Sequence, residues 1–202
     1  MGGIVETAVR RSTQALLDQD EKTATQVILE QPRIARLEME IDGLATRLLA
    51  LHQPVARDLR LLTVALKINA DLFRMGELAK HIAERSLPLI RQRLVKPPEE
   101  IAQMAARVES MLLMCLQAFV SGDAGMARSV LDLDDEVDTL RDAVCSKVQE
   151  AMANAPELVP AAVDLIFVAR DIERIGDHAT NIAEDVVFLV NGEGLRRSVQ
   201  IP

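Results

Sequence analysis

The feature that most constrains the fold is a pattern of residues that occurs twice along the chain. The segments DLFRMGELAKHIAE at 71–84 and DIERIGDHATNIAED at 171–185 lie one hundred residues apart. Their identical positions include Asp71, Arg74, Gly76, Ile82, Ala83 and Glu84 in the first, and Asp171, Arg174, Gly176, Ile182, Ala183 and Glu184 in the second. An earlier pair of segments, 14–28 and 117–131, also aligns. Two copies of one structural unit are therefore expected.

Each unit is predicted to be helical. Apolar residues recur at alternating steps of three and four, and the clearest run is Leu165, Val168, Ile172, Ile175, Ala179, Ile182, Val186 and Leu189. This spacing is typical of helices that pack in a left-handed bundle. Aromatic residues make up only 2% of the chain, whereas strands are enriched in them. An all-α fold is predicted, with helices near 4–18, 22–51, 55–92, 99–121, 124–153 and 157–190.

Proline and glycine mark the ends of these helices. The segment VKPPEE near residue 95 divides the chain into a first three-helix unit, 1–95, and a second, 96–190. The remaining residues, 191–202, lack an apolar face and are expected to be mobile. Pro32 falls within the second helix, where we expect it to kink the helix or separate its first turns.

Composition narrows the possible functions. The formal net charge is −8 and no basic stripe is present, so nucleic-acid binding is not expected. No hydrophobic signal region or membrane-spanning stretch is recognised, so we expect a cytoplasmic protein that reaches a membrane only through partners. Cys115 and Cys145 form no CxxC motif and are expected to be buried, reduced thiols.

Two rows of carboxylates suggest a metal site. On a helical wheel, Glu173, Asp177 and Glu184 fall opposite the apolar seam of the last helix, and Asp134, Asp138 and Asp142 form a similar row on the fifth. Like charges one turn apart cost a few tenths of a kcal/mol, and hard cations with oxygen ligands would offset that cost. The rows are equally compatible with a solvated face whose acids pair with Arg170 and Arg174.

These motifs, with VLDLDDEVDTLRDAV and the duplicated six-helix layout, resemble the PhoU family of phosphate-transport regulators over about Val5 to Val190. The resemblance implies two tandem three-helix bundles in a non-enzymatic cytoplasmic protein, usually a homodimer. It also implies partners, namely the ATPase subunit of a phosphate ABC transporter and a sensor histidine kinase. Such a protein would couple the two and repress the phosphate-starvation response when phosphate is plentiful.

The same resemblance implies metal ions, iron, zinc or magnesium, on acidic motifs, and no organic cofactor. In the second unit the implied ligands are Glu173, Asp177, Asp134 and Asp138, with Asp171 and Glu184 as additions. The first unit departs from this pattern, because Phe73, Lys80, Gln31 and Ala35 stand at the positions equivalent to Glu173, Thr180, Asp134 and Asp138. Only Asp71, Glu77 and Glu84 remain there, so a weaker site or none is expected.

Two other functions stay open. One is a PhoU-like metal-binding adaptor of a different transporter. The other is a metal-dependent enzyme built on a helical bundle, which is less favoured because the sequence shows no nucleophile–base pair, no Ser/His/Asp grouping and no ExxH motif of the di-iron type.

Overall fold

The computed structural model describes residues 1–92 and 96–192, and within them every regular element is helical. The elements are α1 (Gly2–Leu17), α2 (Glu21–His52), α3 (Ala56–Gln92), α4 (Glu99–Ser121), α5 (Ala124–Leu131), α6 (Asp134–Asn154), the 3-10 helix η1 (Pro156–Leu158) and α7 (Val159–Asn191). The all-α prediction is confirmed. The expectation of a mobile tail concerns 191–202, most of which lies outside the described residues.

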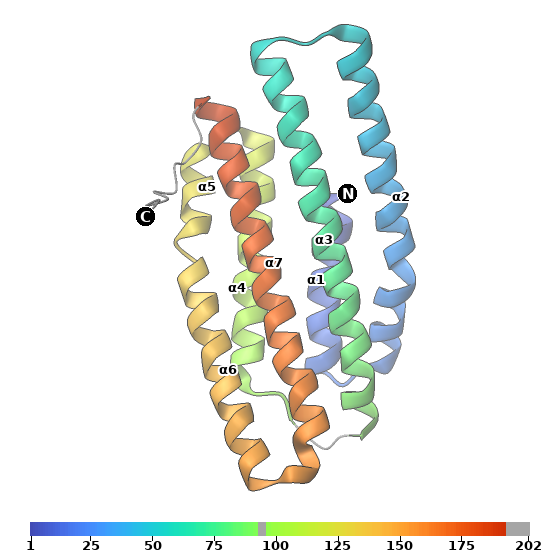
Figure 1. Cartoon of the computed structure of the whole chain (residues 1–202), viewed down its shortest axis with the longest axis vertical. Helices are drawn as coiled ribbons and strands as arrows, with labels where there is room; N and C mark the ends of the chain where they lie inside the picture. The colour runs from blue at the N-terminus through green and yellow to red at the C-terminus, as the bar shows by residue number, and fades with distance from the viewer. Residues whose placement is uncertain (93–95, 193–202) are drawn as a thin grey trace, which may run out of the picture.

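The helices form two bundles side by side, α1–α3 in one and α4–α7 in the other (Figure 1). The last helices of the two bundles, α3 and α7, pack against each other in antiparallel directions along the middle of the molecule (Figure 1). The predicted seam of α7 is buried there, with Ile172, Ile175 and Ile182 at most 1% exposed. Because α7 is covered by both bundles, the two units share one continuous apolar core.

The duplication extends to the helix caps. Asp20 precedes α2 and accepts hydrogen bonds from the backbone N–H groups of Lys22 and Thr23. Asp123, its equivalent in the second unit, precedes α5 and accepts from the N–H groups of Gly125 and Met126. Each aspartate satisfies two amides that have no partner inside the helix. The hydroxyl of Thr23 also donates a hydrogen bond to Asp20. This bond contributes most to lowering the pKa of Asp20, and the two backbone hydrogen bonds lower it further.

The fifth predicted helix is interrupted, which corrects the single helix expected over 124–153. α5 ends at Leu131 and α6 begins at Asp134. The first turn of α6 carries Asp134, Asp135 and Glu136, and negative charge there interacts favourably with the helix dipole. A new helix start is thus stabilised where the sequence has neither Gly nor Pro. At Pro32, in contrast, α2 continues without being divided.

One helix of the described part of the chain, α4, is long and apolar enough to cross a membrane by length and composition. Core helices of water-soluble proteins meet the same criterion. One face of α4 is fully buried against other helices, through Met104, Val108 and Met111 among others, so the feature is weak evidence for a membrane span. Both cysteines are free; Cys115 on α4 is buried as predicted, whereas Cys145 on α6 is only partly buried.

Candidate functional site

An acidic cluster joins α6 to α7, and an arginine lies at its centre. Arg141 of α6 places Nη1 2.7 Å from Oε1 of Glu173 on α7. The same nitrogen lies 3.3 Å from Oδ1 of Asp138, and Nη2 lies 2.9 Å from Oδ1 of Asp142. Asp138 lies about one turn before both Arg141 and Asp142 on α6, whereas Asp142 is the residue that directly follows Arg141. We call Arg141, Asp138, Asp142 and Glu173 the α6–α7 cluster.

The ion pair between Arg141 and Glu173 in this cluster is partly buried. The side chain of Glu173 is 19% exposed and that of Arg141 27%. Burial raises the pKa of Glu173, the neighbouring Asp177 raises it further, and Arg141 offsets part of that rise. The carboxylates in turn raise the pKa of Arg141, and the hydrogen bond to Asp142 contributes most. The guanidinium therefore stabilises the ionised form of Glu173, which burial and Asp177 disfavour.

The other predicted second-bundle residues lie around this cluster rather than within one site. Asp177 is exposed on α7, while Asp134 and Glu184 are partly buried, on α6 and α7. Asp171 is buried and faces the other bundle, where its Oδ2 lies 3.8 Å from Nε of Arg85. Thr180, which lies between Asp177 and Glu184 in the sequence, is buried as well.

In the first bundle each predicted acid contacts a different basic side chain. Oδ1 of Asp71 lies 2.7 Å from Nδ1 of His178, a residue of the second bundle.

The two remaining acids pair within α3. Glu77 accepts from Arg74 at 3.0 Å, and Glu84 pairs with Lys80 at 3.3 Å. The guanidinium of Arg74 also lies 5.9 Å from the ring of Phe73, the residue that replaces the expected glutamate. These acids do not converge on one point. The expectation of a weak metal site or none in this bundle stays a prediction.

Within residues 1–92 and 96–192, no group of three or more His, Cys, Asp or Glu side chains comes together as a metal site. In the α6–α7 cluster, the oxygens that a metal would need already contact a guanidinium. As arranged, these residues do not fit a bound metal, and the metal predicted from the sequence stays a prediction.

Arg141 and His178 were not among the predicted site residues. The signal for Arg141 was present, since it lies three positions after Asp138 on the acidic face of α6. The pairing of His178 with Asp71 had no such signal, because it depends on how the two bundles pack. It is one of several polar contacts between α3 and α7, which include Lys67 with Asp185 at 2.8 Å.

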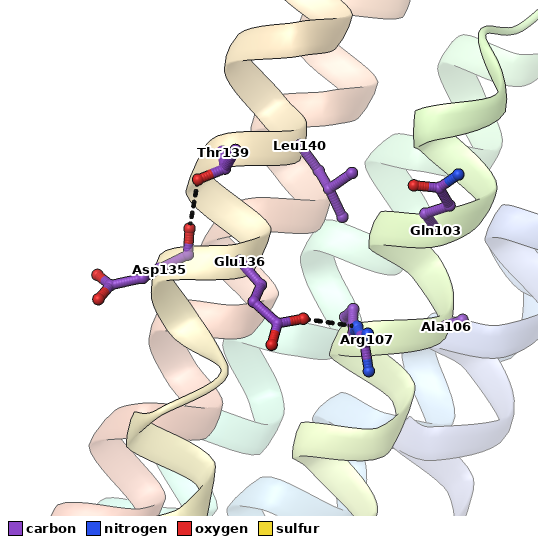
Figure 2. A pocket seen from close by; sticks show the side chains of 7 residues that line it. All are labelled: Gln103, Ala106, Arg107, Asp135, Glu136, Thr139 and Leu140. Carbon is purple, nitrogen blue, oxygen red and sulfur yellow. Dashed lines mark hydrogen bonds and ion pairs between the residues drawn. The ribbon is translucent and has the colours of Figure 1, made fainter.

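A groove of about 640 Å³ lies between α4 and α6, on the outer side of the second bundle. Figure 2 shows Arg107 of α4 and Glu136 of α6 reaching toward each other across it, with Arg107 Nε 2.9 Å from Glu136 Oε2. Gln103, Thr139 and Leu140 also line it. The lining combines apolar, amide, hydroxyl and charged side chains and includes no nucleophile paired with a base.

A family model for the PhoU domain matches residues 1–86 and again 101–186. The chain belongs to the PhoU family. The two matches are offset by the same one hundred residues that separate the repeated motifs, so the predicted duplication is confirmed. The proposed domain limits, 1–95 and 96–190, are not tested by these matches and stay a prediction.

Similar PhoU proteins match along almost the whole chain. The phosphate-specific transport system accessory protein PhoU homologue of Caulobacter vibrioides NA1000 is 38% identical over 196 residues, covering 96% of this chain and 85% of that protein. The homologue of the same name from Pseudomonas aeruginosa is 36% identical, covering 97% and 81%.

Solved PhoU structures confirm the fold. The crystal structure of PhoU from Pseudomonas aeruginosa superposes with a TM-score of 0.91 at 36% identity, covering 96% of this chain and 93% of that one. The phosphate transport system regulatory protein PhoU from Streptococcus pneumoniae gives 0.89 at 29% identity, covering 96% and 91%. These names describe accessory and regulatory proteins, which agrees with the prediction that this PhoU-family chain is not an enzyme.

Proposed function

We propose that this protein is a non-enzymatic cytoplasmic regulator of phosphate transport that associates with a phosphate ABC transporter. The observation that carries the proposal is the match of both repeats, over nearly the full chain, to relatives named as accessory proteins of the phosphate-specific transport system. Identity of 36–38% over that length, together with a shared fold, supports a shared role.

In finer detail, the protein would contact the transporter's ATPase subunit and a sensor histidine kinase, and so repress the phosphate-starvation response when phosphate is plentiful. A role in contacting proteins is supported at the α2–α3 end, which extends beyond the second bundle (Figure 1). Leu51 and Val55 there are 75% exposed. Gln53 and Ala56, at the turn between α2 and α3, adopt positive φ values of 45° and 47°.

A gene deletion tests the regulatory role. Cells that lack the protein are expected to express alkaline phosphatase and the phosphate transporter in phosphate-rich medium, and a plasmid copy is expected to restore repression. Deletion of the kinase gene in the same strain should abolish the expression, because the signal would pass through the kinase. Normal repression in the deletion strain would refute the proposal.

We also propose a homodimer, as the family resemblance implies. Sedimentation equilibrium of the purified chain is expected to give twice the monomer mass. A monomer at all concentrations would refute this part of the proposal and leave the regulatory role untouched.

A further inference from the structure

The α6–α7 cluster contains its own cation. The guanidinium of Arg141 contacts three carboxylates on two helices, at 2.7 Å from Glu173, 2.9 Å from Asp142 and 3.3 Å from Asp138. Its Nε donates to Asp142 as well, at 3.1 Å. All three guanidinium nitrogens are therefore engaged by carboxylate oxygens.

Arginine suits this position for chemical reasons. Its guanidinium stays protonated in proteins and presents donors in a rigid planar fork that matches carboxylates. The bond to Glu173 is the innermost, because both side chains are largely shielded from water. Partly buried pairs are screened less by solvent and salt than exposed ones.

A divalent cation at this place would compete for the same atoms. Mg²⁺ and Mn²⁺ prefer carboxylate oxygens. Asp138 of α6 and Glu173 of α7 each have such an oxygen in contact with the same Arg141 nitrogen, Nη1. For a metal ion to bind, Arg141 would have to move away from the carboxylates. Glu173 would then lose its hydrogen bond from Arg141 and coordinate the metal instead. The positive charge of the displaced guanidinium would also stay nearby on α6.

We propose that Arg141 is the resident cation of the α6–α7 cluster and excludes divalent metal ions from it. The ion pair between Arg141 and Glu173 joins α6 to α7. A metal ion bound between these acids would join the two helices in the same way. This inference is independent of the proposed regulatory function.

The test compares Mn²⁺ binding by the unaltered protein, by Arg141→Met and by Arg107→Met, each freed of metal with a chelator. Methionine keeps much of the arginine stem's volume without its charge. Arg107 is the matched control, because it also forms an ion pair that joins α6 to a neighbouring helix, but with Glu136 at the α4–α6 groove. Free Mn²⁺ is counted by electron paramagnetic resonance, and folding is checked by circular dichroism.

Arg141→Met is expected to bind one Mn²⁺ at least about tenfold more tightly than the unaltered protein, since a charge that repels the ion is gone. Arg107→Met should bind as the unaltered protein does. Adding Glu173→Gln to Arg141→Met should remove the gain. Equal Mn²⁺ affinity with and without Arg141 would overturn the proposal.

A second measurement decides the question if Arg141→Met does not fold. The unaltered protein is titrated with Mn²⁺ beside Glu173→Gln. The proposal predicts weak binding that Glu173→Gln does not change. Stoichiometric binding by the unaltered protein that Glu173→Gln abolishes would show that the metal occupies the cluster and that the proposal is wrong.

Discussion

Gly76 and Gly176 occupy equivalent positions in α3 and α7, and replacing each with alanine isolates one steric contact. In both helices alanine is favoured over glycine by about 0.8–1.0 kcal/mol. At Gly176 the new methyl would lie 3.6 Å from Cγ2 of Val108 and 3.7 Å from Cε of Met111, which is ordinary van der Waals contact. Gly176→Ala is therefore expected to stabilise the protein by about 1 kcal/mol.

At Gly76 the same methyl meets a tighter neighbour. It would lie 2.9 Å from Cδ1 and 3.1 Å from Cγ2 of Ile34, a side chain that is 1% exposed. The Cδ1 atom can rotate away, but Cγ2 is attached to the branched Cβ and moves only if the side chain leaves its preferred rotamer. Overpacking of this kind costs about 1–3 kcal/mol, which equals or exceeds the helix-propensity gain.

The difference between the two variants is thus the steric term alone. Urea denaturation followed by circular dichroism should place Gly176→Ala above Gly76→Ala by about 1–3 kcal/mol in the free energy of unfolding. In thermal unfolding, a difference of about 1 kcal/mol corresponds to about 2–4 °C for a chain of this size. Equal stability of the two variants, or a more stable Gly76→Ala, would refute the reasoning.

Three further predictions concern single side chains. Asp20→Ala and Asp123→Ala should each lower the free energy of unfolding by about 1 kcal/mol, because each removes an N-cap; urea denaturation measures this, and an unchanged midpoint for both would contradict it. Burial raises the pKa of Asp171 above its ordinary 3.8, so its ionisation favours the unfolded state and folded-state stability falls as pH rises from 3.8 through the raised value. Asp171→Asn should therefore gain stability relative to the unaltered protein across that window, and a gain confined to more acidic solution would show the opposite sign. Burial also raises the pKa of the Cys115 thiol to about 12, so a thiol reagent should modify Cys145 first and reach Cys115 only after urea unfolding, as mass spectrometry of the labelled peptides would show.

The fold was predictable because its determinants are local or repeated. The apolar period of residues 165–189 specifies one face of a helix, and the second copy of the motif specifies a second bundle of the same kind. The break at 132–133 was not predictable in the same way, since no Gly or Pro marks it. It depends on the balance between helix continuation and a favourable acidic start at Asp134.

The candidate site was predictable only in part. Helical spacing places Asp138 and Asp142 on one face of α6, and both contact Arg141. It places Glu173 opposite the apolar seam of α7, whereas that side chain is only 19% exposed and contacts Arg141 of α6. Spacing along one helix does not show which side chain of a neighbouring helix fills the gap, so Arg141 was missed. Asp171 was assigned to the acidic set although it faces α3, because the pattern of a single bundle contains no information about a second bundle packed against it.

The claim that this PhoU-family protein serves phosphate transport is tested most directly by its binding to a transporter ATPase. The purified chain would be titrated against the ATPase subunit of the same organism's phosphate ABC transporter and, separately, against the ATPase of an unrelated ABC importer. The account predicts saturable binding to the phosphate ATPase alone. Equal binding to both ATPases, or to neither, would contradict it.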